Sequence, residues 1–132
     1  HRDLHLSIRR QRQMCIRDRG GIVYYANYLK FIERARSNLV ASLGIDQLEL
    51  RSSGMIFVVQ NVYAEYVSPA RMDDNLCVQT DVLDGSQVRW ILQQDIWSEQ
   101  DLLFRATVTI VLTGSNGKPI RLPAKLRRIT AQ

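Results

Sequence analysis

The chain contains one long segment with the period of an amphipathic helix, and most of the sequence after it has the period of β-strands. From Tyr28 onward the apolar side chains follow the i, i+3, i+4 spacing of one helical face. These apolar residues are Tyr28, Phe31, Ile32, Ala35, Leu39, Val40 and Leu43. The charged residues that fill the other positions are Lys30, Glu33, Arg34 and Arg36. Gly44 then provides a typical stop, so we predict one helix from about Ala26 to Leu43.

Four strand-like segments come after this helix. They are MIFVVQNVYAEYV (55–67), LCVQTDVL (76–83), VRWILQQDIW (88–97) and LLFRATVTIVLT (102–113). β-Branched and aromatic residues are frequent in all four, and the last one alternates most clearly. Its residues of one parity are Phe104, Ala106, Val108, Ile110 and Leu112. The breaks DGS, SEQD and GSNGKP have the composition of hairpin turns, and residues 44–54 are interpreted as a connecting segment.

This order of elements limits the possible architectures. A sheet of four long strands has an apolar face that must be covered, and one long helix is available to cover it. We therefore predict an α+β fold in which a curved antiparallel sheet wraps around a single central helix. Such an open sheet has edge strands, so we also expect self-association. A length of 132 residues, with 45% hydrophobic and 23% charged residues, suits one domain.

The first 19 residues carry most of the net charge of +5. They contain six Arg and two Asp, whereas the rest of the chain contains twelve Lys and Arg against eleven Asp and Glu. This N-terminal part has no clear period and is similar to translated adaptor sequence at the edges of assembled reading frames. We interpret residues 1–17 as an irregular basic segment, either partly non-native or a solvated tail, and residues 18–132 as one domain. Because the charge is confined to one end, we expect no nucleic-acid partner.

The sequence offers little support for metal, disulfide or membrane chemistry. Cys15 and Cys77 lack the short spacing of metal ligands and are too few for a disulfide framework, so we expect free thiols. The sequence contains no run of about 18 apolar residues and no apolar stretch typical of a secretory signal. We therefore expect a cytoplasmic protein without a transmembrane segment and without a bound metal.

Three separated motifs give the chain a family resemblance. They are GGIVYYANYLKFIERARS (20–37), VYAEYVSPARMDDNL (62–76) and GKPIRLP (117–123). In this order they resemble the hotdog-fold acyl-CoA thioesterases of the 4-hydroxybenzoyl-CoA thioesterase group, in particular its Tol-Pal-associated branch. The resemblance runs from about Asp18 to Leu126. It implies a helix enclosed by a curved antiparallel sheet, protomers paired by sheet edges, and active sites between protomers. The family's first strand has no evident counterpart upstream of Asp18.

The resemblance also suggests which residues form the active site. Asp18, two residues before the glycine pair, takes the position of the family's carboxylate, which attacks the thioester carbonyl or activates water. Gly20 and Gly21 allow the backbone to approach a ligand closely, and free N–H groups at the start of a helix favour negative charge. By analogy the Tyr25 N–H is the favoured oxyanion donor. Tyr25 also stands where members of the branch often have His.

Other roles remain open for these residues. Asp18 is also compatible with a solvated loop carboxylate. The tyrosines of YYANY suit core or interface packing, which leaves Tyr25 as a candidate for the acyl pocket and Tyr28 as a weaker substrate-binding candidate. Asn27 suits the N-cap of the helix, and residues 73–74 suit a solvated turn.

Coenzyme A carries phosphates, so basic side chains are expected near the mouth of the pocket. The candidates are Arg71, Arg89, Lys118, Arg121 and Lys125, and for each of them taken alone a solvated surface charge is the preferred interpretation.

The predicted function is hydrolysis of acyl-CoA to free acid and CoA, with no cofactor, by a homodimer or homotetramer. Acyl carrier protein is a further candidate partner. The alternative is a non-catalytic hotdog protein that binds acyl-CoA or a protein partner. A hotdog dehydratase is disfavoured because that chemistry relies on His, and the histidines are His1 and His5.

Overall fold

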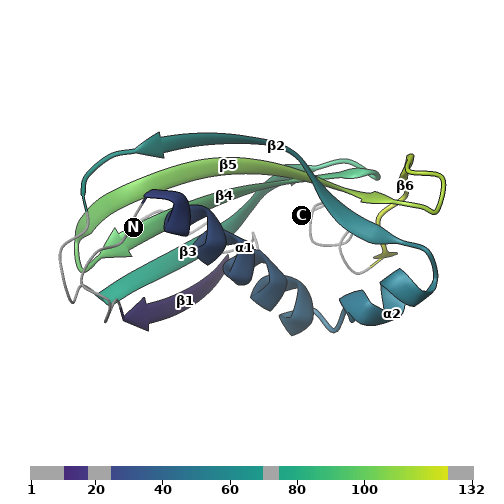
Figure 1. Ribbon diagram of the computed structural model, residues 1–132, viewed down its shortest axis with the longest axis horizontal. Helices are drawn as coiled ribbons and strands as arrows, with labels where there is room; N and C mark the ends of the chain where they lie inside the picture. Colours follow the sequence, from purple (N-terminus) through teal and green to yellow (C-terminus); the bar gives the residue numbers. More distant parts are fainter. Residues whose placement is uncertain (1–10, 18–24, 70–74, 125–132) are drawn as a thin grey trace.

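The structure is a computed structural model and describes residues 11–17, 25–69 and 75–124. Its elements are β1 (Gln11–Arg17), α1 (Tyr25–Ser42), α2 (Gln47–Ser52), β2 (Ile56–Tyr66), β3 (Asn75–Gly85), β4 (Arg89–Ser98), β5 (Asp101–Thr113) and β6 (Pro119–Ile120). The strands form one antiparallel sheet in the order β1-β3-β4-β5-β2, and β6 pairs with β5. The sheet curves around α1, which lies along one face (Figure 1). The predicted α+β hotdog architecture is confirmed.

Helix α1 occupies nearly the predicted range, and its apolar face enters the core. Tyr28, Ile32, Ala35 and Leu39 are at most 1% exposed. Gly44 has φ = 80°, a left-handed conformation that glycine adopts readily after a helix. The suggestion that Asn27 caps the helix is wrong, because α1 already begins at Tyr25.

The inner face of the sheet consists of alternate residues of β3, β4 and β5. In β5 the five apolar residues predicted to share a face are all between 0% and 4% exposed. Trp90 of β4 and Leu76 of β3 are fully buried on the same face. Each large apolar side chain buried in this way stabilises the fold by about 1.5–3 kcal/mol. The sheet and α1 are therefore held together by one apolar core.

Strand β1 corrects the interpretation of residues 1–17 as irregular. Gln11–Arg17 pairs antiparallel with β3, and Met14 lies opposite Val78 and packs against the core. The strand escaped prediction because polar residues dominate it, which suits an edge position but gives no clear alternation. It also corrects the view that the family's first strand has no counterpart here. Residues 1–10 lie outside the described part of the chain.

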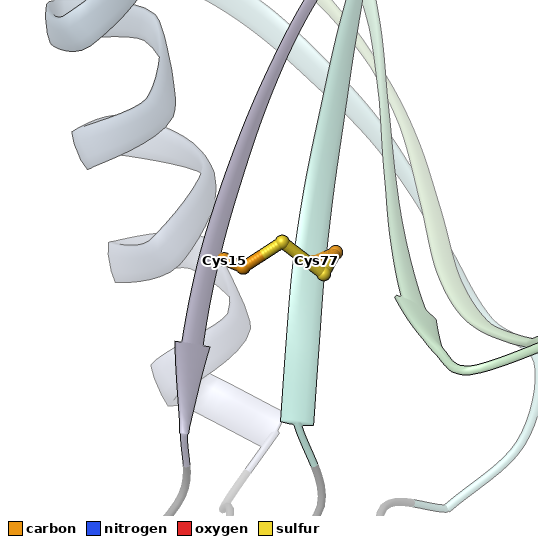
Figure 2. The surroundings of a disulfide bond; sticks show 2 residues. All are labelled: Cys15 and Cys77. Carbon is orange, nitrogen blue, oxygen red and sulfur yellow. A yellow bond between two sulfur atoms is a disulfide. The ribbon is translucent and has the colours of Figure 1, made fainter.

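The expectation of free thiols at Cys15 and Cys77 is wrong as well. The two residues are direct partners in the β1–β3 register, with Cα atoms 4.0 Å apart, and their sulfur atoms form a disulfide (Figure 2). They are 62 positions apart in sequence, so no spacing rule could have paired them. The bond joins β1 to β3 near the end of β1, shortly before the chain enters the segment that contains Asp18.

The connecting segment 44–54 contains a short helix that was not predicted. Asp46 caps α2, because its carboxylate accepts hydrogen bonds from the N–H groups of Leu48 (2.9 Å) and Glu49 (3.3 Å). An Asp followed three positions later by a Glu is a recognised start signal for a helix. The helix leads the chain from the end of α1 to the start of β2 (Figure 1).

Candidate active site

The predicted catalytic segment lies between β1 and α1. Asp18, Gly20 and Gly21 are outside the described residues, and so is the side chain of Tyr25. The ends of the segment are described: β1 stops at Arg17, and Tyr25 is the first residue of α1. The first N–H groups of a helix have no intrahelical partner, so the Tyr25 amide belongs to the set available for a ligand.

Tyr28 anchors the start of α1 to the sheet. Its side chain is 0% exposed, and its ring centre lies 5.2 Å from that of Phe104 in β5 and 6.0 Å from that of Tyr66 in β2. The ring of Phe31 lies 6.5 Å away on the next turn. These contacts favour the packing role of Tyr28 over direct contact with substrate. The cluster fixes the helix start against the end of β2.

The basic candidates that the structure describes lie at the other end of the sheet. Arg89 opens β4 opposite Val111, and Lys118 and Arg121 flank β6. All three are exposed. From Val111 to Phe104, which contacts Tyr28, β5 runs seven residues, or roughly 23 Å. Within one chain the structure therefore does not bring these basic residues to the helix start. Arg71 and Lys125 are outside the described residues.

A buried polar network links α1 to the middle of the sheet, and the sequence did not reveal it. Gln94 of β4 is 0% exposed. Its Nε2 donates to the Ile32 carbonyl (2.9 Å) and to Thr80 Oγ1 (3.0 Å), and its Oε1 accepts from Arg36 Nη1 (2.9 Å). Burial lowers the pKa of Arg36, with Glu33 acting in the opposite direction. A residue that the helical pattern places on the polar face thus turns partly inward.

Arg36 lines a pocket of about 110 Å³ between α1 and the first half of β2. The lining residues are Glu33, Arg36, Ser37, Val40, Gln47, Phe57, Val58, Val59 and Ile110. We call this cavity the Arg36 pocket. It combines apolar walls with one half-buried cation, and no single stretch of sequence indicates it because four elements contribute to it.

On the opposite face of the sheet, Arg105 of β5 forms a two-point ion pair with Asp95 of β4. Nε and Nη2 of Arg105 donate to the two carboxylate oxygens at 2.9 and 3.0 Å. The hydrogen bond to Asp95 is the main reason that the pKa of Arg105 is raised. Within ranges 11–17, 25–69 and 75–124, no group of three His, Cys, Asp or Glu residues could hold a metal. No helix in these ranges is long and apolar enough to cross a membrane.

Strand β2 is an edge strand with an unusually apolar exposed surface. Its neighbour on one side is β5, and no described strand lies on the other side. Seven large apolar side chains in and directly after β2 are exposed: Ile56, Val58, Val59, Val62, Tyr63, Tyr66 and Val67. Isolated exposed apolar residues are ordinary, whereas this row of exposed apolar side chains on an unpaired edge strand is a surface on which another chain could pair.

Comparison with known proteins agrees with this fold. Residues 16–129 match the Thioesterase-like superfamily. The chain belongs to this superfamily. Acyl-CoA thioester hydrolase YbgC of Escherichia coli O157:H7 is 35% identical over 111 residues, which cover 83% of both chains. Acyl-CoA thioesterase YbgC of Haemophilus influenzae is 31% identical over 112 residues, covering 83% of this chain and 82% of the relative.

Solved structures place the chain among hotdog thioesterases. A probable thioesterase from Bartonella henselae superposes with a TM-score of 0.80 at 30% identity, covering 86% of this chain and all of that one. A 4-hydroxybenzoyl CoA thioesterase superposes with a TM-score of 0.78, covering 92% of this chain and 99% of that one. At 21% identity the second similarity concerns the fold alone. The family resemblance of the three motifs is confirmed.

Proposed function

We propose that the protein is an acyl-CoA thioesterase, which hydrolyses acyl-CoA to a free acid and coenzyme A. The observation that carries this proposal is the match to YbgC, 35% identical over 83% of both chains. The family match from residue 16 to residue 129 includes the segment leading into α1, the helix itself and the strands behind it. The geometry supports it, because the Tyr28 cluster holds the helix start in place next to the segment that contains Asp18.

In the proposed mechanism Asp18 acts as nucleophile or as general base. Its carboxylate either attacks the thioester carbonyl carbon, giving an anhydride that water then opens, or removes a proton from an attacking water. In both routes the carbonyl oxygen becomes negatively charged and accepts hydrogen bonds from N–H groups at the start of α1, including that of Tyr25. The carbon–sulfur bond then breaks, and coenzyme A leaves as a thiolate that takes up a proton.

We further propose that two copies join through β2. Antiparallel pairing of β2 with its own symmetry copy would continue the sheet and cover the exposed apolar row. Because β2 begins near the basic end of the sheet and ends at the Tyr28 cluster, this pairing sets the basic end of one copy beside the helix start of the other. Arg89, Lys118 and Arg121 would then reach coenzyme A phosphates bound at the second copy. A tetramer would be a pair of such dimers.

The remaining parts of the proposal concern cellular context. We place the protein in the Tol-Pal-associated branch and in the cytoplasm, where acyl-CoA is used. Acyl carrier protein is an alternative carrier of the acyl group. In a reducing compartment the Cys15–Cys77 disulfide would open, because cytosolic thiols are kept reduced.

Replacing the proposed catalytic carboxylate tests this function. Purified protein should release free thiol from a series of acyl-CoAs, and Asp18→Asn should lower kcat by about 100-fold or more, since positioned acid–base groups contribute this much. Asp101→Asn, an exposed carboxylate at the start of β5, serves as the matched control. Binding of acyl-CoA without turnover at any chain length would instead favour the non-catalytic alternative.

A further inference from the structure

Arg36 is a half-buried cation with an incomplete set of partners. A guanidinium has five N–H donors, and the hydrogen bond recorded for Arg36 uses Nη1 alone, toward Gln94. The carboxylate of Glu33 acts on the charge of Arg36, but among the described residues no ion pair joins the two side chains. A partly desolvated charge in this situation is costly unless an acceptor joins it. The donors that Gln94 leaves unused are therefore available to an oxygen ligand.

The guanidinium is also held in a fixed position. Gln94 donates both Nε2 hydrogen bonds, to Ile32 and Thr80, which directs its Oε1 toward Arg36. Gln94 has no solvent exposure, so the orientation of its amide is set by the core. A donor that is oriented in advance loses little conformational entropy on binding, which favours affinity and selectivity.

The Arg36 pocket has the size and lining of a site for the end of a short chain. Its volume of about 110 Å³ is several times the ~30 Å³ that one water occupies in the liquid. Val40, Phe57 and Ile110 offer apolar contact for methylene groups. Glu33 also lines the pocket, but its side chain is exposed, so water and salt screen its charge. Of the two charged residues that line the pocket, Arg36 is the one that is partly buried and held toward it by Gln94.

The position of the pocket connects it with the proposed catalysis. Its β2 residues, Phe57 to Val59, lie near the start of the strand, whereas Tyr66 at the end of β2 contacts Tyr28. If two copies of β2 pair antiparallel, the Arg36 pocket of one copy lies beside the helix start of the other. An acyl group attached to coenzyme A at that helix start could extend into it.

We propose that the Arg36 pocket is a subsite for acyl groups that end in a carboxylate, and that Arg36 of the second copy recognises this carboxylate. This inference rests on the proposed thioesterase function and on pairing through β2. A carboxylate is the strongest complement to a guanidinium, because it can accept two parallel N–H hydrogen bonds. The class of substrate is therefore a short dicarboxylic acid joined to coenzyme A through one of its two carboxyl groups.

Glutaryl-CoA and pentanoyl-CoA provide a matched pair of probes, since they have the same chain length and differ in the terminal carboxylate. Their kcat/KM values are measured, and their Kd values are measured separately with analogues in which methylene replaces the thioester sulfur. Wild-type protein should favour the glutaryl compound, and Arg36→Gln should reduce this preference about tenfold or more, the usual range for a charged hydrogen bond. Arg36→Lys should retain part of it. Arg34→Gln, an exposed arginine outside the pocket, is the control and should retain all of it.

A second variant keeps the test valid if Arg36→Gln does not fold. Ser37→Phe places a larger side chain at the edge of the Arg36 pocket, which fills part of it and leaves the Gln94 network intact. This variant should therefore also reduce the glutaryl preference. A wild-type preference that survives in a folded Arg36→Gln or Ser37→Phe variant would overturn the subsite, as would equal wild-type binding of the two analogues. Arg36-dependent binding without turnover of either thioester would support the subsite and reject the proposed hydrolysis.

Discussion

Strands β5 and β2 are neighbours in the sheet with similar apolar content, yet β5 is mostly buried and β2 is mostly exposed. Nine residues of β5 are buried, and of β2 only Phe57 and Ala64 are even partly buried. β5 has strands on both sides and α1 over its inner face, whereas β2 has a strand on one side alone among the described residues. The difference shows that an apolar strand pattern predicts a surface that is to be buried. The pattern does not tell whether the same chain or a second chain buries it.

The largest expected loss of stability comes from a substitution in the buried strand, β5. Phe104→Ala should lower the free energy of unfolding by about 3–5 kcal/mol, because it removes a fully buried ring and leaves a cavity under Tyr28. The measurement is urea denaturation at low protein concentration. Tyr63→Ala on β2, where the side chain is 68% exposed, should cost less than about 1 kcal/mol under the same conditions. Equal losses would mean that β2 is as enclosed as β5 in a single copy.

A smaller effect is expected from the polar network inside the core. Gln94→Leu keeps the volume but leaves Thr80 Oγ1 and Arg36 without their partner, so it should cost about 1–3 kcal/mol. A double-mutant cycle with Arg36→Leu measures the direct coupling. The double mutant should lose less stability than the sum of the two single losses, because the two side chains share a hydrogen bond. Additive losses in the cycle would show that this hydrogen bond contributes nothing to stability.

The ion pair on the outer face should give an asymmetric result. Arg105→Gln leaves Asp95 buried with its charge, whereas Asp95→Asn leaves an arginine that is 44% exposed and can be hydrated. We expect a cost of about 1–2 kcal/mol for the first change and about 0.5–1 kcal/mol for the second. Thermal unfolding of both variants is the measurement, and a larger loss for Asp95→Asn would contradict the assignment.

The same ion pair predicts how the stability lost in Arg105→Gln depends on pH. The pKa of Arg105 is raised in the folded protein, so its contribution is complete below the ordinary pKa of arginine and is lost only above it. The cost of Arg105→Gln should therefore stay constant between about pH 6 and pH 9. A cost that changed within this range would require another titrating group beside the pair.

The sequence was sufficient for the elements whose period is strong and whose partners come in chain order. Helix α1 and strands β2, β3, β4 and β5 lie within two residues of the predicted segments. β1 was missed because its edge position lets polar residues dominate, and the Cys15–Cys77 pair depends on a register set by that strand. The start signal of α2 at Asp46 is present in the sequence, but the helix that follows it has only six residues, too few to show a helical period.

The candidate site divides in the same way. Asp18 and the helix start belong to local motifs, so the family resemblance could assign their roles, and these assignments stay predictions. The Arg36 pocket depends on side chains of α1, α2, β2 and β5 that meet only after folding. The helical pattern predicts that Arg36 lies on the solvent face. In the structure its side chain is partly buried, because it donates a hydrogen bond to Gln94, 58 positions away. Interactions of this kind are not encoded in any short stretch of sequence.

The central claim is that catalysis needs two copies joined through β2, and Val62→Lys tests it most directly. Val62 lies near the middle of β2 and is 42% exposed, so in a symmetric pair each new lysine would face the other copy and repel it. Molar mass and acyl-CoA hydrolysis are measured on the same samples, with Leu48→Lys on α2 as the exposed control. We expect wild type and control to have at least twice the 15.2 kDa of one chain and to be active, and Val62→Lys to lose both mass and activity. A folded, monomeric Val62→Lys protein with the wild-type rate would contradict the claim.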